Sequence, residues 1–120
     1  GSGVEMILGV ENDSTFGPVI MLGMGGIFAE LFKDVTFRVT PVSSQQAAAM
    51  TQEIRSGKLL SGFRGKPKCD VDGLTGAICR LSLLAQYLSG VVSQIDINPL
   101  AVLEEGKGVV ALDAVFLTES

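Results

Sequence analysis

The stretch QIDINPL, residues 94–100, together with the acidic residue Asp113 that follows it, decides how this sequence is interpreted. Residues 94–103 and 107–117 are both rich in Val, Ile, Leu and Ala, and Glu105-Gly106 lies between them. Two apolar runs separated by a Gly-containing turn are typical of a β-hairpin. The sequence therefore predicts that the two runs pair as antiparallel strands.

The position of the turn sets which residues face each other. If the turn is centred between Glu105 and Gly106, opposed residues have numbers that sum to 211, and Asn98 faces Asp113. Side chains directly opposite on antiparallel strands have Cβ atoms about 4.5–5.5 Å apart. An amide oxygen and a carboxylate at that separation suit Mg²⁺, which takes oxygen ligands, keeps several waters and needs few protein groups. The alternative is that Asn98-Pro99 is a turn or bulge and that Asp113 is an ordinary edge carboxylate.

The side-chain alternation of the two strands supports this register. One face is predicted to be apolar throughout, with Ile95, Ile97, Ala101 and Leu103 against Val110, Leu112, Ala114 and Phe116. The other face carries Gln94, Asp96, Asn98 and Asp113 among Val109, Ala111 and Val115. A slip of one residue would move Asp113 into the apolar layer and away from Asn98.

The composition excludes several classes of function. The chain has 120 residues, 47% of them hydrophobic and 18% charged, which indicates one folded domain or part of one. A net charge of −4 without a Lys/Arg cluster argues against nucleic acid or an anionic membrane as the partner. Histidine is absent, so His-based acid–base work, phosphohistidine formation in this chain and His-ligated zinc are excluded. The two cysteines, Cys69 and Cys79, lack metal-site spacing and are expected to be reduced thiols in the cytoplasm.

The rest of the chain reads as alternating groups of strands and helices. Ser43 and Gln46 have the spacing of a capping box, which predicts a helix from Ser43 to about Ser56-Gly57, and Asp70 begins a longer helix that Gly90 ends. Leu59 to Lys68 is predicted to be a loop, and the expected strands are Val4–Val10, Pro18–Leu22 and Val35–Thr40. The predicted fold class is α+β, a largely antiparallel sheet with two helices on one face. The other face, with Asp96, Asn98 and Asp113, would be open to a ligand or another domain.

An ordered series of motifs along the chain resembles a known family. These are Gly3-Val4-Glu5, Phe16 to Met21, Gly23 to Glu30, Arg38 to Pro41, Gly62-Phe63-Arg64-Gly65 and Ile95 to Leu100. Together they resemble the later, C-terminal part of the ATP-grasp domain of the nucleoside-diphosphate-forming acyl-CoA synthetases. That group includes ADP-forming acetyl-CoA synthetase and is related to the β subunit of succinyl-CoA synthetase. The resemblance covers nearly the whole chain: residues 1–3 are expected to be a cloning remnant, and residues 4–120 one lobe of the fold.

The resemblance implies a site for ATP or ADP between two lobes, with Mg²⁺ held by Asn98 and Asp113. It also implies a reaction in which the γ-phosphoryl group passes to a histidine, then to an acyl phosphate, before the acyl group reaches coenzyme A. The implied partners are the missing N-terminal ATP-grasp lobe, CoA-binding and ligase domains or an α subunit, and a small-molecule acid with CoA. We therefore expect the chain to be a fragment that is inactive alone, because phosphoryl transfer depends on positioning from several sides. The segment between Asn98 and Asp113 is about one residue longer than in the succinyl-CoA relatives.

The resemblance also suggests two catalytic residues, Arg38 and Glu30. Arg38 would project from the sheet face beside the metal pair and contact phosphate through its planar guanidinium group. The alternative for Arg38 is a salt bridge with Glu30 or Asp96. Glu30 would orient neighbours in the cleft, or would be a surface strand charge.

Three further residues are candidates for cofactor binding. Glu5 faces ATP or the metal, or is a solvated strand charge; Asp96 organises hydrogen bonds at the site, or is a further ligand. Arg64 contacts an anion or the hairpin. The glycines from Gly23 to Gly26 are interpreted as sites of close backbone packing and not as a phosphate-binding loop, because the lysine and helix of a P-loop are missing.

A second class of function remains open. The chain is then a non-catalytic α+β interaction or regulatory module, attached to an acetyltransferase or to a partner subunit. Only the enzyme hypothesis predicts that the full-length protein binds nucleotide.

Overall fold

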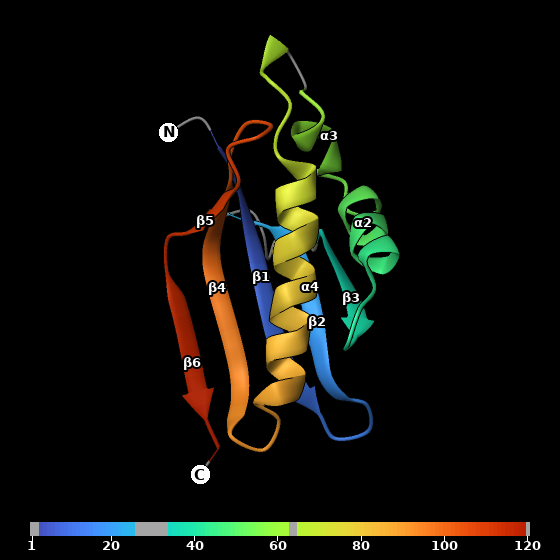
Figure 1. The fold of residues 1–120 in the computed structure, drawn as a ribbon, viewed down its shortest axis with the longest axis vertical. Helices are drawn as coiled ribbons and strands as arrows, with labels where there is room; N and C mark the ends of the chain where they lie inside the picture. Colours follow the sequence, from blue (N-terminus) through green and yellow to red (C-terminus); the bar gives the residue numbers. More distant parts are fainter. Residues whose placement is uncertain (1–2, 26–33, 63–64, 120) are drawn as a thin grey trace.

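The computed structural model describes residues 3–25, 34–62 and 65–119 (Figure 1). Within these residues, six strands form one antiparallel sheet in the order β3-β2-β1-β4-β5, and β6 also pairs with β4. The strands are β1 Val4–Asp13, β2 Gly17–Met24, β3 Val35–Val39, β4 Val92–Val102, β5 Val109–Ala111 and β6 Ala114–Thr118. The helices are α2 Ser44–Glu53, α3 Gly57–Leu60 and α4 Val71–Tyr87. The predicted α+β class with an antiparallel sheet is confirmed.

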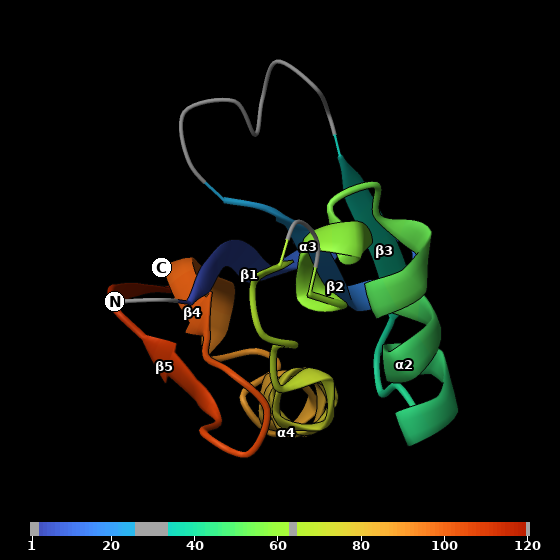
Figure 2. The ribbon, with the colours of Figure 1, turned by 90° about the horizontal axis from the view of Figure 1, so that it is seen from above.

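The core lies between α4 and one face of the sheet. Figure 2 shows α4 on one side of β1, β2 and β4, with α2 alongside β3. Alternate residues of the central strands enter this core together with one stripe of α4: Met6, Leu8, Ile20, Leu22, Ile95, Leu74 and Ile78. We call this side of the sheet the helix-covered face and the other side the open face. No helix among the described residues is long and apolar enough to cross a membrane.

The helix boundaries follow from local signals in the sequence. The capping box before α2 is confirmed: the Gln46 N–H donates to Ser43 Oγ at 3.1 Å, and the Ser43 N–H donates to Gln46 Oε1 at 2.8 Å. Asp70 caps α4 through a 2.9 Å bond from the Gly73 N–H. Gly90 lies beyond the end of α4 with φ 88°, a left-handed conformation that glycine adopts at little cost.

The end of α2 differs from the prediction because of a buried side chain from another element. α2 ends at Glu53, and residues 57–60 form the short helix α3 within the region predicted as a helix end and loop. The Arg55 and Ser56 N–H groups donate to the Asp34 carboxylate, at 2.5 and 2.7 Å, instead of continuing the helix. Burial by itself raises the pKa of Asp34, but these hydrogen bonds outweigh burial and hold the pKa below its ordinary value.

Replacing Asp34 with Asn should lower the free energy of unfolding at pH 7 by roughly 1–3 kcal/mol, because buried N–H groups lose a charged acceptor. The pKa of Asp34 is lowered in the folded chain, so the carboxylate stabilises the fold above the unfolded pKa, near 3.8. That stabilisation is lost as the pH falls through the folded pKa. The difference in the free energy of unfolding between wild type and Asp34→Asn, measured by urea unfolding, should therefore become smaller in strong acid. Glu11→Gln, at an exposed position of β1, is the control. A stability difference between wild type and Asp34→Asn that grows in acid would contradict the stabilising role of the Asp34 carboxylate.

Candidate functional site

The terminal hairpin has the register predicted from the sequence. Ile97 pairs with Ala114 and Leu100 with Ala111, and between these two pairs the Asn98 N–H donates to the Asp113 carbonyl oxygen at 3.1 Å. Asn98 and Asp113 are therefore directly opposite each other, and both are exposed. Ile97, the neighbour of Asn98, packs against the core, so Asn98 and Asp113 belong to the open face.

The hairpin departs from the predicted alternation beyond Asn98. Leu8 pairs with Ile97 and Met6 with Leu100, so β4 has two residues, Asn98 and Pro99, where β1 has only Ile7. This is a β-bulge, and its extra residue moves every later side chain of β4 to the opposite face. The bulge that the sequence offered as an alternative is thus present together with the Asn98–Asp113 opposition.

The predicted apolar face is therefore wrong past the bulge. Leu100 and Val102 pack in the core on the helix-covered face, whereas Ala101, although buried, is opposite Glu5 on the open face. On the partner strand, Val109 packs against the core, whereas Val110 and Leu112 are 44% and 58% exposed. Unbroken alternation was the false assumption, because a single additional residue reverses the faces.

The open face is acidic near the hairpin. The open-face positions of β1, β4 and the segment before β6 include five carboxylates, Glu5, Glu11, Asp13, Asp96 and Asp113. No Lys or Arg stands at an open-face position of the described strands. Glu5 is opposite Ala101, and Asp96 is opposite Gly9. Such a surface attracts cations and repels a bare phosphate.

The donor chemistry of Asn98 and Asp113 fits a hard cation. Within the described part of the chain, no side chain hydrogen-bonds or ion-pairs with either of them, so both oxygens are available. The described residues contain no group of three or more His, Cys, Asp or Glu placed to hold a metal ion. Two oxygen donors without a further cage suit Mg²⁺, which retains waters and shares its coordination with substrate phosphates.

A pocket of about 430 Å³ lies on the open face beside Asp96. Gly9 has no side chain to occupy this space; a Cβ at Gly9 would lie 3.9 Å from Met21 Cε and 4.0 Å from Asp96 Oδ1. The pocket is lined by Gly9 to Asp13, Val19, Met21, Phe37 and Gln94 to Asp96. This pocket was not predicted from the sequence, although the alternation of β1 and β2 places Met21 on the open face.

Arg38 does not lie on the face that carries Asn98 and Asp113, so the predicted placement of Arg38 is wrong. Arg38 is opposite Ile20, a core residue, and therefore belongs to the helix-covered face. Its guanidinium group forms an ion pair with Glu53 of α2 and donates to Thr36 Oγ1 at 3.2 Å. The hydrogen bond between Arg38 and Glu53 raises the pKa of Arg38 and lowers the pKa of Glu53. The sequence offered Asp96 as a partner, and the observed partner is Glu53 instead; Glu30, the other partner offered, lies outside the described residues.

The other candidates divide into those on the open face and those outside the described residues. Glu5 is exposed on the open face, and Asp96 is half-buried there. Glu30 and Arg64 lie outside the described residues. The Gly25 N–H donates to the Glu5 carbonyl oxygen at 3.0 Å, and a Cβ at Gly25 would lie 2.7 Å from that oxygen. Close backbone packing thus explains Gly25, whose N–H is not free for a phosphate.

The fold and the acidic open face define a class of protein. The ATP-grasp domain family model matches residues 1–117, so the chain belongs to the ATP-grasp domain family. The subunit beta of acetate–CoA ligase [ADP-forming] II from Pyrococcus furiosus is 39% identical over 112 residues, which are 93% of this chain and 48% of that protein. The 4-hydroxybutyrate–CoA ligase [ADP-forming] from Nitrosopumilus maritimus is 45% identical over 92% of this chain and 16% of its own length.

Solved structures give the same result. A crystal structure from Pyrococcus horikoshii superimposes with a TM-score of 0.93 at 36% identity, covering 99% of this chain and 50% of that one. An acetyl-coenzyme A synthetase from Ca. Korarchaeum cryptofilum, in complex with coenzyme A and Mg-AMPPCP, superimposes with a TM-score of 0.92 at 37% identity. The match covers 99% of this chain and 55% of that one. The chain thus spans about half the length of these relatives, and a smaller share of the longer ligases.

Proposed function

We propose that this chain is the nucleotide- and magnesium-binding lobe of an ADP-forming acyl-CoA synthetase, an acid–thiol ligase. The observation that carries the proposal is the hairpin register, which sets Asn98 opposite Asp113 on the open face. The similarity to ADP-forming acetate–CoA and 4-hydroxybutyrate–CoA ligases supports it. The full-length enzyme would interconvert acyl-CoA, ADP and phosphate with a carboxylic acid, CoA and ATP.

Each side chain of the open face has a limited part in this proposal. Asn98 and Asp113 would hold Mg²⁺, which when bound neutralises phosphate charge and orients the phosphoryl group. Asp96, half-buried between the pocket and the pair, would organise hydrogen bonds, and Glu5 would face the nucleotide or metal from β1. Arg38 is not assigned a contact with phosphate in this proposal, because its guanidinium group forms an ion pair with Glu53 on the helix-covered face.

The remaining components would come from outside this chain. The chain has no histidine, so a phosphohistidine intermediate would need a residue from another domain or subunit. A Korarchaeum relative carries a phosphohistidine segment that points towards its nucleotide site. We infer that an N-terminal ATP-grasp lobe and CoA-binding domains or an α subunit complete the enzyme. Both cysteines are free, which suits a reducing cytoplasm.

Isothermal titration calorimetry with ATP or ADP tests this function on the full-length enzyme. We expect nucleotide binding that weakens strongly when Mg²⁺ is replaced by EDTA, because the two ligands act on phosphate only through the metal. The 120-residue chain should bind weakly or not at all, since it supplies one side of the site. Absence of Mg²⁺-dependent binding by the full-length protein would contradict the proposal and favour the interaction or regulatory module.

A further inference from the structure

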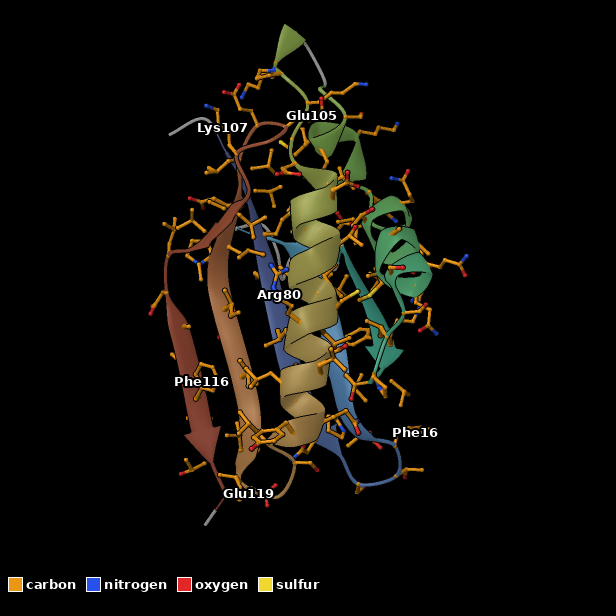
Figure 3. All side chains as sticks on the ribbon, in the orientation of Figure 1. Phe16, Arg80, Glu105, Lys107, Phe116 and Glu119 are labelled. Carbon is orange, nitrogen blue, oxygen red and sulfur yellow. The ribbon has the colours of Figure 1, made fainter. Side chains whose placement is uncertain are left out.

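The carboxylate of Asp70 joins two elements that are far apart in the sequence. Its Oδ1 accepts the Gly73 N–H at 2.9 Å and caps α4, while its Oδ2 accepts the Gly108 N–H at 2.8 Å. Gly108 belongs to the turn of the β4–β5 hairpin. Figure 3 shows this turn, with Glu105 and Lys107, beside the N-terminal end of α4.

Main-chain hydrogen bonds hold the same two segments in register. The Asp70 N–H donates to the Leu103 carbonyl oxygen at 2.7 Å, and the Glu105 N–H donates to the Lys68 carbonyl oxygen at 2.8 Å. The turn itself is closed by a 3.0 Å bond from the Leu103 N–H to the Gly108 carbonyl oxygen. Lys68 to Asp70 thus lies along one side of the turn, and the Asp70 carboxylate is the side-chain contact that reaches its far end.

This contact bears on the position of Asp113. β5 follows Gly108 directly, pairs with β4 through only three residues, and leads to Asp113 two residues after its end. β6, on the other side of Asp113, pairs with β4 and is exposed throughout. Asp113 is therefore held from two sides, by the β4–β6 pairing and by the short β5 ladder, whose turn is anchored to α4 through Asp70. We propose that Asp70 is a positioning residue for the Asn98–Asp113 pair, an inference that rests on the function proposed above.

The competing explanation is that Asp70 serves only as the N-cap of α4. Asp70→Ser separates the two roles, because serine is as good an N-cap as aspartate but is too short to reach Gly108 as well. Asp70→Ala removes both contacts. The control is Ile54→Val, a mild change at a buried residue that caps the C-terminal end of α2 and takes no part in the hydrogen bond between the Asp70 carboxylate and Gly108.

Hydrogen exchange on the 120-residue chain tests the contact without any nucleotide. In Asp70→Ser we expect faster exchange at Gly108, Leu112 and Asn98, with Gly73 and Leu74 close to wild type. Leu112 and Asn98 report on the site itself, because their N–H groups donate to the Pro99 and Asp113 carbonyl oxygens. Unchanged exchange at Leu112 and Asn98 would overturn the proposal.

Magnesium titration of the full-length enzyme, with nucleotide held constant, tests the consequence. Asp70→Ser should raise the Mg²⁺ concentration for half-maximal nucleotide binding by ~3–10-fold. Asp70→Ala should do at least as much, and Ile54→Val should leave the Mg²⁺ dependence at the wild-type value. A Ser variant with the wild-type Mg²⁺ dependence would overturn the positioning role even where Asp113→Asn abolishes binding. If Asp113→Asn itself has no effect, it is the proposed function that fails.

Discussion

Replacing Asp113 with Asn in the full-length enzyme will lower its nucleotide-dependent turnover by a factor of about 10²–10³ and leave the fold unchanged. The substitution preserves shape but removes the anionic oxygen that a hard cation prefers. Asp113 is exposed and has no side-chain partner among the described residues, so folding should be unaffected. Turnover should be measured with thermal unfolding and a Mg²⁺ titration, in which the variant needs more metal for half-maximal activity.

The matched control for this experiment is Asp72→Asn. Asp72 is an exposed carboxylate in the first turn of α4, on the other side of the sheet from Asp113. The same chemical change there should alter activity by less than about twofold. Equal activities of Asp113→Asn and wild type across the titration would remove Asp113 from the metal site and leave the acidic open face without the proposed role.

Ile78→Ala should produce the largest loss of stability. Ile78 is 0% exposed and packs from the middle of α4 against the sheet. Truncating a buried isoleucine removes apolar contacts and leaves a cavity, at a cost of about 2–5 kcal/mol. Because domains of this size are stable by only about 5–15 kcal/mol, the variant should unfold at a much lower urea concentration. Urea unfolding of the 120-residue chain, followed by circular dichroism, measures the difference.

Leu83→Ala on the same helix separates burial from helix propensity. Leu83 is 61% exposed, so the loss of its side chain should change the free energy of unfolding by about 0.5 kcal/mol or less. Both substitutions introduce alanine, which favours helix equally at the two positions. If Leu83→Ala lowered the free energy of unfolding as much as Ile78→Ala, α4 would not bury the face that carries Ile78.

The features predicted correctly are those that depend on residues close in sequence. The capping box at Ser43 and Gln46, the Asp70 cap and the glycine stop at Gly90 each act within a few residues, and all three are present. The hairpin register also depends on a local turn, so the opposition of Asn98 and Asp113 follows from the sequence alone. Its proposed role as a metal pair stays a prediction.

The features that were missed depend on contacts between distant residues. Arg38 lies on the helix-covered face because β2 pairs with β3 so that Ile20 is opposite Arg38, a register that no local turn records. Pro99 suggested a bulge, but the reversal of faces that the bulge causes depends on the pairing with β1, which lies some ninety residues earlier in the chain. Asp34 ends α2 across a separation of 21 residues, and Asp70 reaches the hairpin turn across 38.

The sequence alone thus determined the main helices and their caps, most of the strands, and the hairpin turn that sets Asn98 opposite Asp113, because caps and turns are local and act through neighbouring backbone groups. Only the tertiary structure decided which strand faces meet the helices, where the open-face pocket forms and what holds the hairpin turn against α4. Those outcomes depend on strand order, on one extra residue in β4 and on side chains from remote segments. Their energies arise only when the sheet is assembled.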